Sequence, residues 1–178
     1  MKGIIFNAVE AAVTDLYSAD TWDDLLEVAE IDGSFTALGT YDDAQLLALV
    51  GAGCAATGHE PDVLVRTLGC HAFPYLARRY PEFVEDVADT RAFLRSVDEI
   101  IHPEVMKLHP DATPPRFFYE DLDNGALRMT YQSERRLGVL AEGLIAGAAV
   151  WFGEQASIEL VSGDGEATTT YDIHIASA

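Results

Sequence analysis

The sixteen residues from Leu137 to Phe152 are the most apolar segment of the chain, and Glu142 is their only charged residue. A segment of this length falls short of the roughly 20 residues that a helix needs to cross a bilayer. A helix that is apolar on every face has to be covered on every side by other parts of a folded domain. We therefore expect the chain to build a hydrophobic core around a helix at this position.

The residues before this segment show helical periodicity. Apolar residues recur at helical spacing over residues 3–17, and the other predicted helices cover about 20–29, 42–56, 61–79 and 90–108. Asp20 or Thr21 is the predicted cap of the second helix. The last helix should kink near His102, because Pro103 lacks an N–H and its ring clashes with the carbonyl four residues earlier.

Strand character begins after residue 110. Residues 116–120 and 126–132 flank Asp123-Asn124-Gly125, which is a hairpin signal. Residues 157–161 and 168–175 form a second predicted hairpin after the apolar helix. The order of elements predicts an α+β fold in a single domain, 1–178. Its helical part would cover about 1–110, and its part with a small antiparallel sheet and one long buried helix about 111–178.

Charge and cysteine content narrow the classes of function. Thirty acidic and eleven basic residues give 178 residues a formal net charge of −19, which repels phosphate backbones and anionic membrane surfaces. We therefore expect neither nucleic-acid nor membrane binding. Cys54 and Cys70 form neither a metal-binding spacing nor a disulfide framework. The opening residues 1–6 are too short an apolar run for a signal peptide, so we expect a cytoplasmic protein.

The segment Tyr131-Gln132-Ser133-Glu134-Arg135 gathers two hydroxyls and one guanidinium. Alternation in an extended chain places residues 131, 133 and 135 on one face, where three hydrogen-bond donors suit a pair of carboxylates. His102, on another predicted element, can supply a metal ligand. Haem is a ligand that combines a metal with carboxylates, because it carries an iron and two propionates. The alternative for residues 131–135 is the end of a strand with a surface arginine. The alternative for His102 is a hydrogen-bonded histidine at the boundary of the core that binds no metal.

A competing motif is Gly51-Ala52-Gly53-Cys54-Ala55-Ala56, which has the glycine pattern of a dinucleotide site and would suit an NAD-dependent oxidoreductase. The apolar residues before it have helical spacing, Pro61 would end the following helix early, and no strand ending in an acid follows about 20 residues later. We therefore interpret these glycines as helix–helix contacts. Gly143 and Gly147 in the apolar helix suit either close helix packing or the approach of a flat ligand.

Taken together, these features resemble the haem–nitric oxide/oxygen-binding (H-NOX) family, the bacterial relatives of the sensory domain of soluble guanylate cyclase. The resemblance extends over essentially the whole chain and is carried by residues 1–6, Ile101-His102-Pro103-Glu104-Val105, Thr113-Pro114-Pro115-Arg116-Phe117, Tyr131 to Arg135 and residues 141–148. It implies the H-NOX fold, haem b as cofactor, and a gas sensor rather than an enzyme.

The resemblance also implies roles for single residues. His102 would be the proximal iron ligand, and Tyr131, Ser133 and Arg135 would hold the propionates. Pro115 matches a proline that presses on the porphyrin and distorts it. The distal wall would consist of Ile5, Val9, Leu140 and Leu144, with Leu76 added by a looser alignment.

Leu140 decides the expected gas. Relatives that bind dioxygen stably carry a tyrosine there, whose hydroxyl donates to the bound gas, whereas leucine has no donor. The resemblance therefore implies selectivity for nitric oxide, with carbon monoxide also admitted, and an oxygen or redox haem sensor as the alternative. Weakening or rupture of the iron–His102 bond would signal to a separate histidine kinase or cyclic-di-nucleotide enzyme. A cysteine zinc site found near the C-terminus of many relatives is not expected, because residues 159–174 contain no cysteine.

Overall fold

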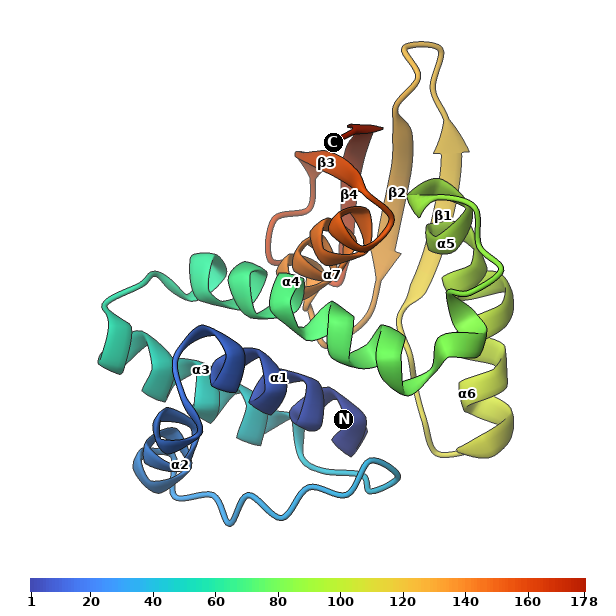
Figure 1. Cartoon of the computed structure of the whole chain (residues 1–178). Helices are drawn as coiled ribbons and strands as arrows, with labels where there is room; N and C mark the ends of the chain where they lie inside the picture. Colours follow the sequence, from blue (N-terminus) through green and yellow to red (C-terminus); the bar gives the residue numbers. More distant parts are fainter.

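The computed structural model describes residues 1–178, and helix α4 runs through the middle of the molecule (Figure 1). Helices α1 to α3 lie on one side of α4, and α7 with the sheet lies on the other. The elements are α1 (Gly3–Leu16), α2 (Ala19–Val28), α3 (Asp43–Thr57), α4 (Pro61–Arg79), the 3-10 turn η1 (Pro81–Phe83), α5 (Thr90–Ser96), the π-helical turn η2 (Val97–Ile101), α6 (His102–Leu108), β1 (Arg116–Asp121), β2 (Leu127–Gln132), α7 (Gly138–Trp151), β3 (Glu154–Ser162) and β4 (Thr168–Ser177). The predicted α+β order of elements is confirmed.

Local signals set most of the helix ends in the N-terminal part. The Asp42 side chain accepts a hydrogen bond from the Ala44 N–H and caps α3, which ends at Gly58 in the left-handed conformation with φ 73°. Pro61 starts α4, where a missing N–H has no cost. The predicted cap of α2 is wrong: Ser18, rather than Asp20 or Thr21, accepts the hydrogen bond from the Thr21 N–H.

The four strands form one antiparallel sheet in the order β1-β2-β4-β3. Leu127, Met129 and Tyr131 of β2 are buried and alternate with more exposed residues, as the sequence pattern predicts. Helix α7 lies between this face of the sheet and α4 (Figure 1). Most of the apolar segment 137–152 is therefore covered on both sides, whereas Val150 and Trp151 near its end are exposed.

Helices α4 and α7 approach each other closely. A Cβ added to Gly143 would overlap the carbonyl oxygen of Arg66 and lie 2.9 Å from the Cα of Gly69. Close helix packing by Gly143 is therefore confirmed. Beside it, Arg66 Nε donates to Glu142 Oε2 at 2.8 Å, which gives the one acid of the apolar helix a partner on α4.

The glycine motif at residues 51–56 lies inside α3 and follows helical residues, so it does not have the strand–turn–helix context of a dinucleotide site. A Cβ at Gly53 would contact Leu64 of α4, which confirms a helix–helix contact there. Gly51 has nothing within 4 Å of such a Cβ, so that part of the interpretation is wrong. No helix of the chain combines the length and the apolar character that crossing a bilayer requires.

Candidate functional site

His102 is the first residue of α6 and follows directly on the π-helical turn. Its ring stacks on Phe117 of β1, with 5.7 Å between centroids, and its buried Nδ1 has no hydrogen-bond partner. Burial lowers the pKa of His102, while the carboxylate of Asp98 and the carbonyl of Pro115 act in the opposite direction. The neutral imidazole is favoured, and this is the form that binds metals.

Tyr131 lies opposite Phe117 in the β1–β2 register and is 3% exposed. The two rings are 5.8 Å apart between centroids, so His102, Phe117 and Tyr131 follow one another in a row. The Tyr131 hydroxyl accepts a hydrogen bond of 3.1 Å from the Leu137 N–H, immediately before α7. Its own O–H remains free to donate to a ligand.

The extended conformation that the sequence predicted for residues 131–135 ends at Gln132. Residues 133–136 form a turn in which the Arg136 N–H donates to the Ser133 carbonyl at 3.1 Å, and Arg136 has φ 55°. The Ser133 hydroxyl accepts the Arg135 N–H at 3.2 Å. The alternation argument is therefore wrong beyond Gln132, because a turn and not a strand brings Arg135 to the site.

The Arg135 guanidinium turns inward and contacts two other segments. Its Nε donates to Asp43 Oδ2 at 2.7 Å, and its two Nη atoms donate to the carbonyl and the hydroxyl of Thr113. Asp43 also lies 2.6 Å from the N-terminal ammonium. Burial raises the pKa of Asp43, but the ammonium and Arg135 outweigh this effect and lower it. Three of the five guanidinium N–H groups are used, and two remain for an anionic ligand.

The predicted apolar wall comes from α1 and α7. Val9 is buried in the core of the helical part, and Leu144 packs against both that core and the core beneath the sheet. Leu76 packs against the helical core. Ile5 and Leu140 are half-buried and belong to neither core. They are apolar residues that the protein itself covers only in part.

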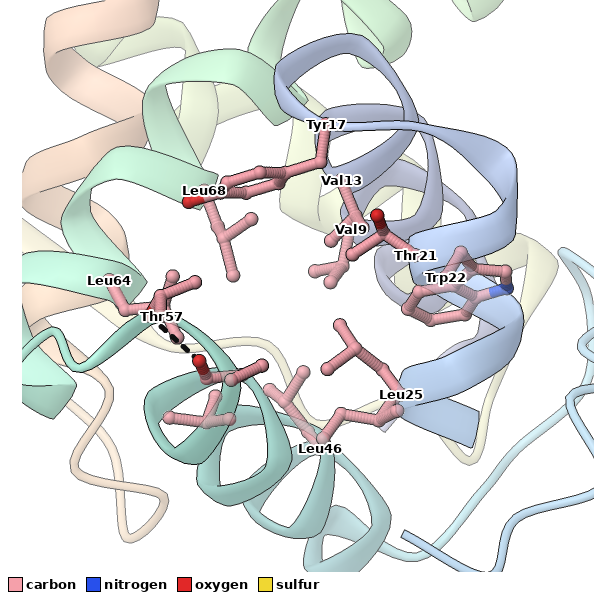
Figure 2. A pocket seen from close by; sticks show the side chains of 14 residues that line it. Val9, Val13, Tyr17, Thr21, Trp22, Leu25, Leu46, Thr57, Leu64 and Leu68 are labelled. Carbon is pink, nitrogen blue, oxygen red and sulfur yellow. Dashed lines mark hydrogen bonds between the residues drawn. The ribbon is translucent and has the colours of Figure 1, made fainter. Parts of the chain in front are cut away.

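Two cavities lie near these residues. One of about 40 Å³ adjoins the arginine and is lined by Met1, Asp43, Leu46, Leu47, Arg135 and Leu137. The other, of about 30 Å³, lies inside the helical part between α1, α2, α3 and α4 (Figure 2). Of the predicted site residues only Val9 lines this second cavity. It is separate from the His102–Phe117–Tyr131 row.

The donor set fits an iron porphyrin. A half-buried imidazole with an unpartnered nitrogen suits the metal, and a tyrosine O–H with free guanidinium N–H groups suits carboxylates. Half-buried apolar residues suit a flat hydrocarbon surface. The rings of His102 and Tyr131 both lie against Phe117, and Pro115 lies beside His102. Ser133 is in the same turn as Arg135.

Sequence reasoning gave no role to Asp43, Asp98 or Phe117. Phe117 could have been found from the two predicted strands of the first hairpin, because their register places it opposite Tyr131. Asp98 Oδ1 accepts the Phe117 N–H at 3.0 Å and so fixes the turn before His102 to the sheet. Asp43 lies 92 residues from Arg135, and no local signal connects the two.

Residues 2–160 match the family described as Haem-NO-binding. An H-NOX protein from S. oneidensis in the Fe(II)NO ligation state has 28% sequence identity and a TM-score of 0.90, with 99% of this chain and 100% of that chain covered. The Fe(II) unliganded H-NOX protein from K. algicida has 30% identity and a TM-score of 0.84, with 100% and 98% covered. The I5F mutant of T. tengcongensis H-NOX has 26% identity and a TM-score of 0.85, with 98% and 97% covered.

Proposed function

The chain belongs to the haem-NO-binding (H-NOX) family, and on that premise we propose that it is a nitric oxide sensor that signals to a separate protein. Domains of this family bind haem iron and a gas and are sensors without catalytic activity. The gas, the site residues and the partner are the parts that we propose. The proposal rests above all on the half-buried imidazole of His102, whose buried Nδ1 has no hydrogen-bond partner and whose ring stacks on Phe117 of the sheet.

We assign the iron ligand to His102 and the carboxylate contacts to Tyr131, Ser133 and Arg135. Haem supplies an iron that binds a diatomic gas, and its propionates need donors at the edge of the pocket. Tyr131 offers a free O–H, and Arg135 offers two free N–H groups whose direction is fixed by Asp43 and Thr113. Hydrogen bonds to charged groups contribute about 1.5–3 kcal/mol each. Pro115 lies beside His102, immediately before β1, and would press on the porphyrin.

The wall residues support selectivity for nitric oxide. Ile5, Val9, Leu140 and Leu144 carry no hydrogen-bond donor, so a bound dioxygen with its polar character would gain nothing from them. Nitric oxide needs no such donor to bind ferrous iron strongly, and carbon monoxide is admitted for the same reason. A sensor that binds dioxygen stably would need a hydrogen-bond donor on this wall.

The gas assignment can be tested by absorption spectroscopy. The reduced protein is measured under argon, then with nitric oxide, and separately after exposure to air. We expect a spectral change with nitric oxide and no stable oxy spectrum in air. A persistent oxy spectrum would exclude the proposed selectivity, and protein that stays colourless after expression with ample haem would exclude the site altogether.

The ligand assignment can be tested by substituting His102→Gly and supplying imidazole. Removal of the side chain should abolish the spectrum of histidine-ligated ferrous haem, and free imidazole should restore it by entering the space left behind. Histidine at position 59 offers a control, because it is exposed and follows the end of α3. His59→Gly should leave the spectrum unchanged. An unchanged spectrum for His102→Gly would show that another residue holds the iron.

The proposed partner is a histidine kinase or an enzyme of cyclic-di-nucleotide turnover. The proposed location of the protein is the cytoplasm. Cys54 and Cys70 are both free, which suits a reducing compartment. Residues 1–178 would act as one domain, because Leu144 contributes to both cores. A partner candidate should show nitric-oxide-dependent activity with the native protein and lose that dependence with His102→Gly.

A further inference from the structure

The helix that leads to His102 contains one π-helical turn. The dihedral angles remain helical through Ile101 and His102, but the N–H of His102 donates to the carbonyl of Val97, five residues earlier. An α-helix would use the carbonyl of Asp98 instead. A π-turn therefore takes up one residue more than an α-turn, and such turns occur mostly as single insertions within α-helices.

The extra residue decides the direction of the imidazole. Each residue of an α-helix advances the side-chain direction by about 100°. In an unbroken α-helix, His102 would point about 180° away from Phe93, which is buried in the core beneath the sheet. With one residue absorbed by the π-turn, His102 points instead about 80° from Phe93, close to the direction of Leu94. Leu94 is also buried in that core, so the π-turn places the histidine on the inward face.

Pro103 accounts for the absence of an α-helical turn immediately before α6. Its ring would collide with the carbonyl of Glu99 in an α-helix, and it has no N–H with which to form the lost hydrogen bond. The wider turn separates these two groups. Pro103 occupies the first turn of α6, where the absence of an N–H is tolerated.

A second contact holds the π-turn from outside. Asp98, within the turn, accepts the N–H of Phe117 at 3.0 Å, and Phe117 is the ring on which His102 stacks. The opposite side of the turn faces solvent, since Ile100 is exposed. The turn is therefore attached to the sheet through Asp98 on one side and free on the other.

We propose that Pro103 is a positioning residue for His102: it excludes the α-helical register over residues 97–103 and so keeps the imidazole on the inward face of the helix. This inference rests on the proposed ligation of iron by His102. Pro103 touches no ligand itself and acts only through the register of the backbone.

The register can be measured directly by nuclear magnetic resonance. Scalar coupling through a hydrogen bond identifies the carbonyl that accepts the His102 N–H, and the CO-bound ferrous protein is diamagnetic, which permits the measurement. The native protein should show coupling from the His102 nitrogen to the Val97 carbonyl carbon. In Pro103→Ala this coupling should be lost and replaced by coupling to the Asp98 carbonyl carbon.

The iron–histidine stretching vibration of the unliganded ferrous protein gives a second, independent measurement. We expect Pro103→Ala to lower its frequency or abolish it. Adding deletion of Ile100 to Pro103→Ala removes the extra residue, so a continuous α-helix would again point His102 inward, and the vibration should return. Pro61→Ala, a proline at the first position of α4, is the matched control and should change neither measurement.

Two results would overturn the inference. One is a Pro103→Ala protein that keeps the Val97 coupling, whatever its vibration. The other is a change of register in Pro103→Ala with an unaltered vibration, because the direction of His102 would then not depend on the register. A native protein that shows the Val97 coupling but no iron–histidine vibration would refute the ligand assignment while leaving the account of the register intact.

Discussion

A single missing hydroxyl at position 140 accounts for the proposed gas selectivity. Leu140 is half-buried on α7 and belongs to neither core, so a larger side chain there replaces no residue of either core. Leu140→Tyr should raise the oxygen affinity of the ferrous protein about tenfold or more, because one hydrogen bond to a polar ligand contributes about 1.5 kcal/mol. Oxygen titration followed by absorption measures the effect.

Leu140→Phe is the control for that experiment, since it adds the ring without the hydroxyl. It should leave the oxygen affinity near that of the native protein. An equal gain in both variants would mean that the ring and not the hydrogen bond stabilises the bound gas, and the argument from the donor would fail.

The ion pairs of Asp43 predict a dependence of stability on pH. The folded-state pKa of this carboxyl is lower than its value of about 3.9 in an unfolded chain. Its stabilising contribution is therefore fully present above about pH 4 and is lost as the pH falls through the lower folded value. The free energy of unfolding of the native protein should exceed that of Asp43→Asn at pH 6, and the difference should shrink below pH 4.

Urea denaturation of both proteins between pH 3 and pH 6 measures this difference. Asp42→Asn is a suitable comparison, because Asn caps a helix about as well as Asp and Asp42 makes no ion pair. A difference between native protein and Asp43→Asn that stays constant down to pH 3 would contradict the lowered pKa.

At the scale of elements, the crossing of α4 and α7 is limited by backbone atoms. A methyl group at Gly143 would meet the backbone of Arg66 and Gly69, neither of which can rotate away. Gly143→Ala should therefore destabilise the protein by about 1–3 kcal/mol or more. Gly51→Ala lies within α3 with open space around it, and should stabilise by about 0.5–1 kcal/mol. Chemical denaturation of the two variants should show shifts of opposite sign.

The elements that could be predicted from sequence are those whose ends are set by adjacent residues. Pro61, Gly58 and Asp89 each fix a helix end through their own backbone or side chain, and these ends lie within one residue of the predicted ranges 42–56, 61–79 and 90–108. The turn after Gln132 was not predicted, because it begins where the β2–β4 pairing ends, and the last hydrogen bond there joins Ser133 to Ala167, 34 residues later in the chain. The π-turn was likewise not predicted, since it is attached to a distant strand through Asp98, whose carboxylate accepts the Phe117 N–H.

At the scale of the whole molecule, an ion pair joins the two sides of the α4–α7 crossing. Glu142 has a side chain only 11% exposed, whereas that of Arg66 is 45% exposed. Removing the arginine leaves a nearly buried carboxylate without its partner, while removing the charge of Glu142 leaves an arginine that water can reach. Arg66→Met should therefore cost about 1–3 kcal/mol, and Glu142→Gln less than about 1 kcal/mol.

The same denaturation experiment on both variants decides the order of the two effects. Arg78→Met is the control, an exposed arginine in the last turn of α4 for which no ion pair is found. Equal losses in Arg66→Met and Glu142→Gln would indicate that both partners are hydrated and that the pair contributes little.

The site as a whole is assembled from segments that lie far apart in sequence, and this limited its prediction from patterns. The residue types in His102 and Tyr131 to Arg135 were sufficient to suggest a metal with two carboxylates. Their orientation depends on Asp43, Asp98 and Thr113, which chemistry alone did not single out. The class of ligand could thus be predicted from residue types, whereas the direction of each side chain depends on tertiary contacts that the sequence does not indicate.

We expect the cavity between α1, α2, α3 and α4 to make the helical part of the molecule the more compressible one (Figure 2). Unfolding of this part eliminates its cavity and so decreases the total volume. Hydrostatic pressure should therefore destabilise this part before the sheet. The two tryptophans can monitor the two parts separately, because Trp22 lines the cavity and Trp151 is the last residue of α7. In high-pressure spectra of the CO-bound protein, the indole N–H signal of Trp22 should shift or fade at lower pressure than that of Trp151.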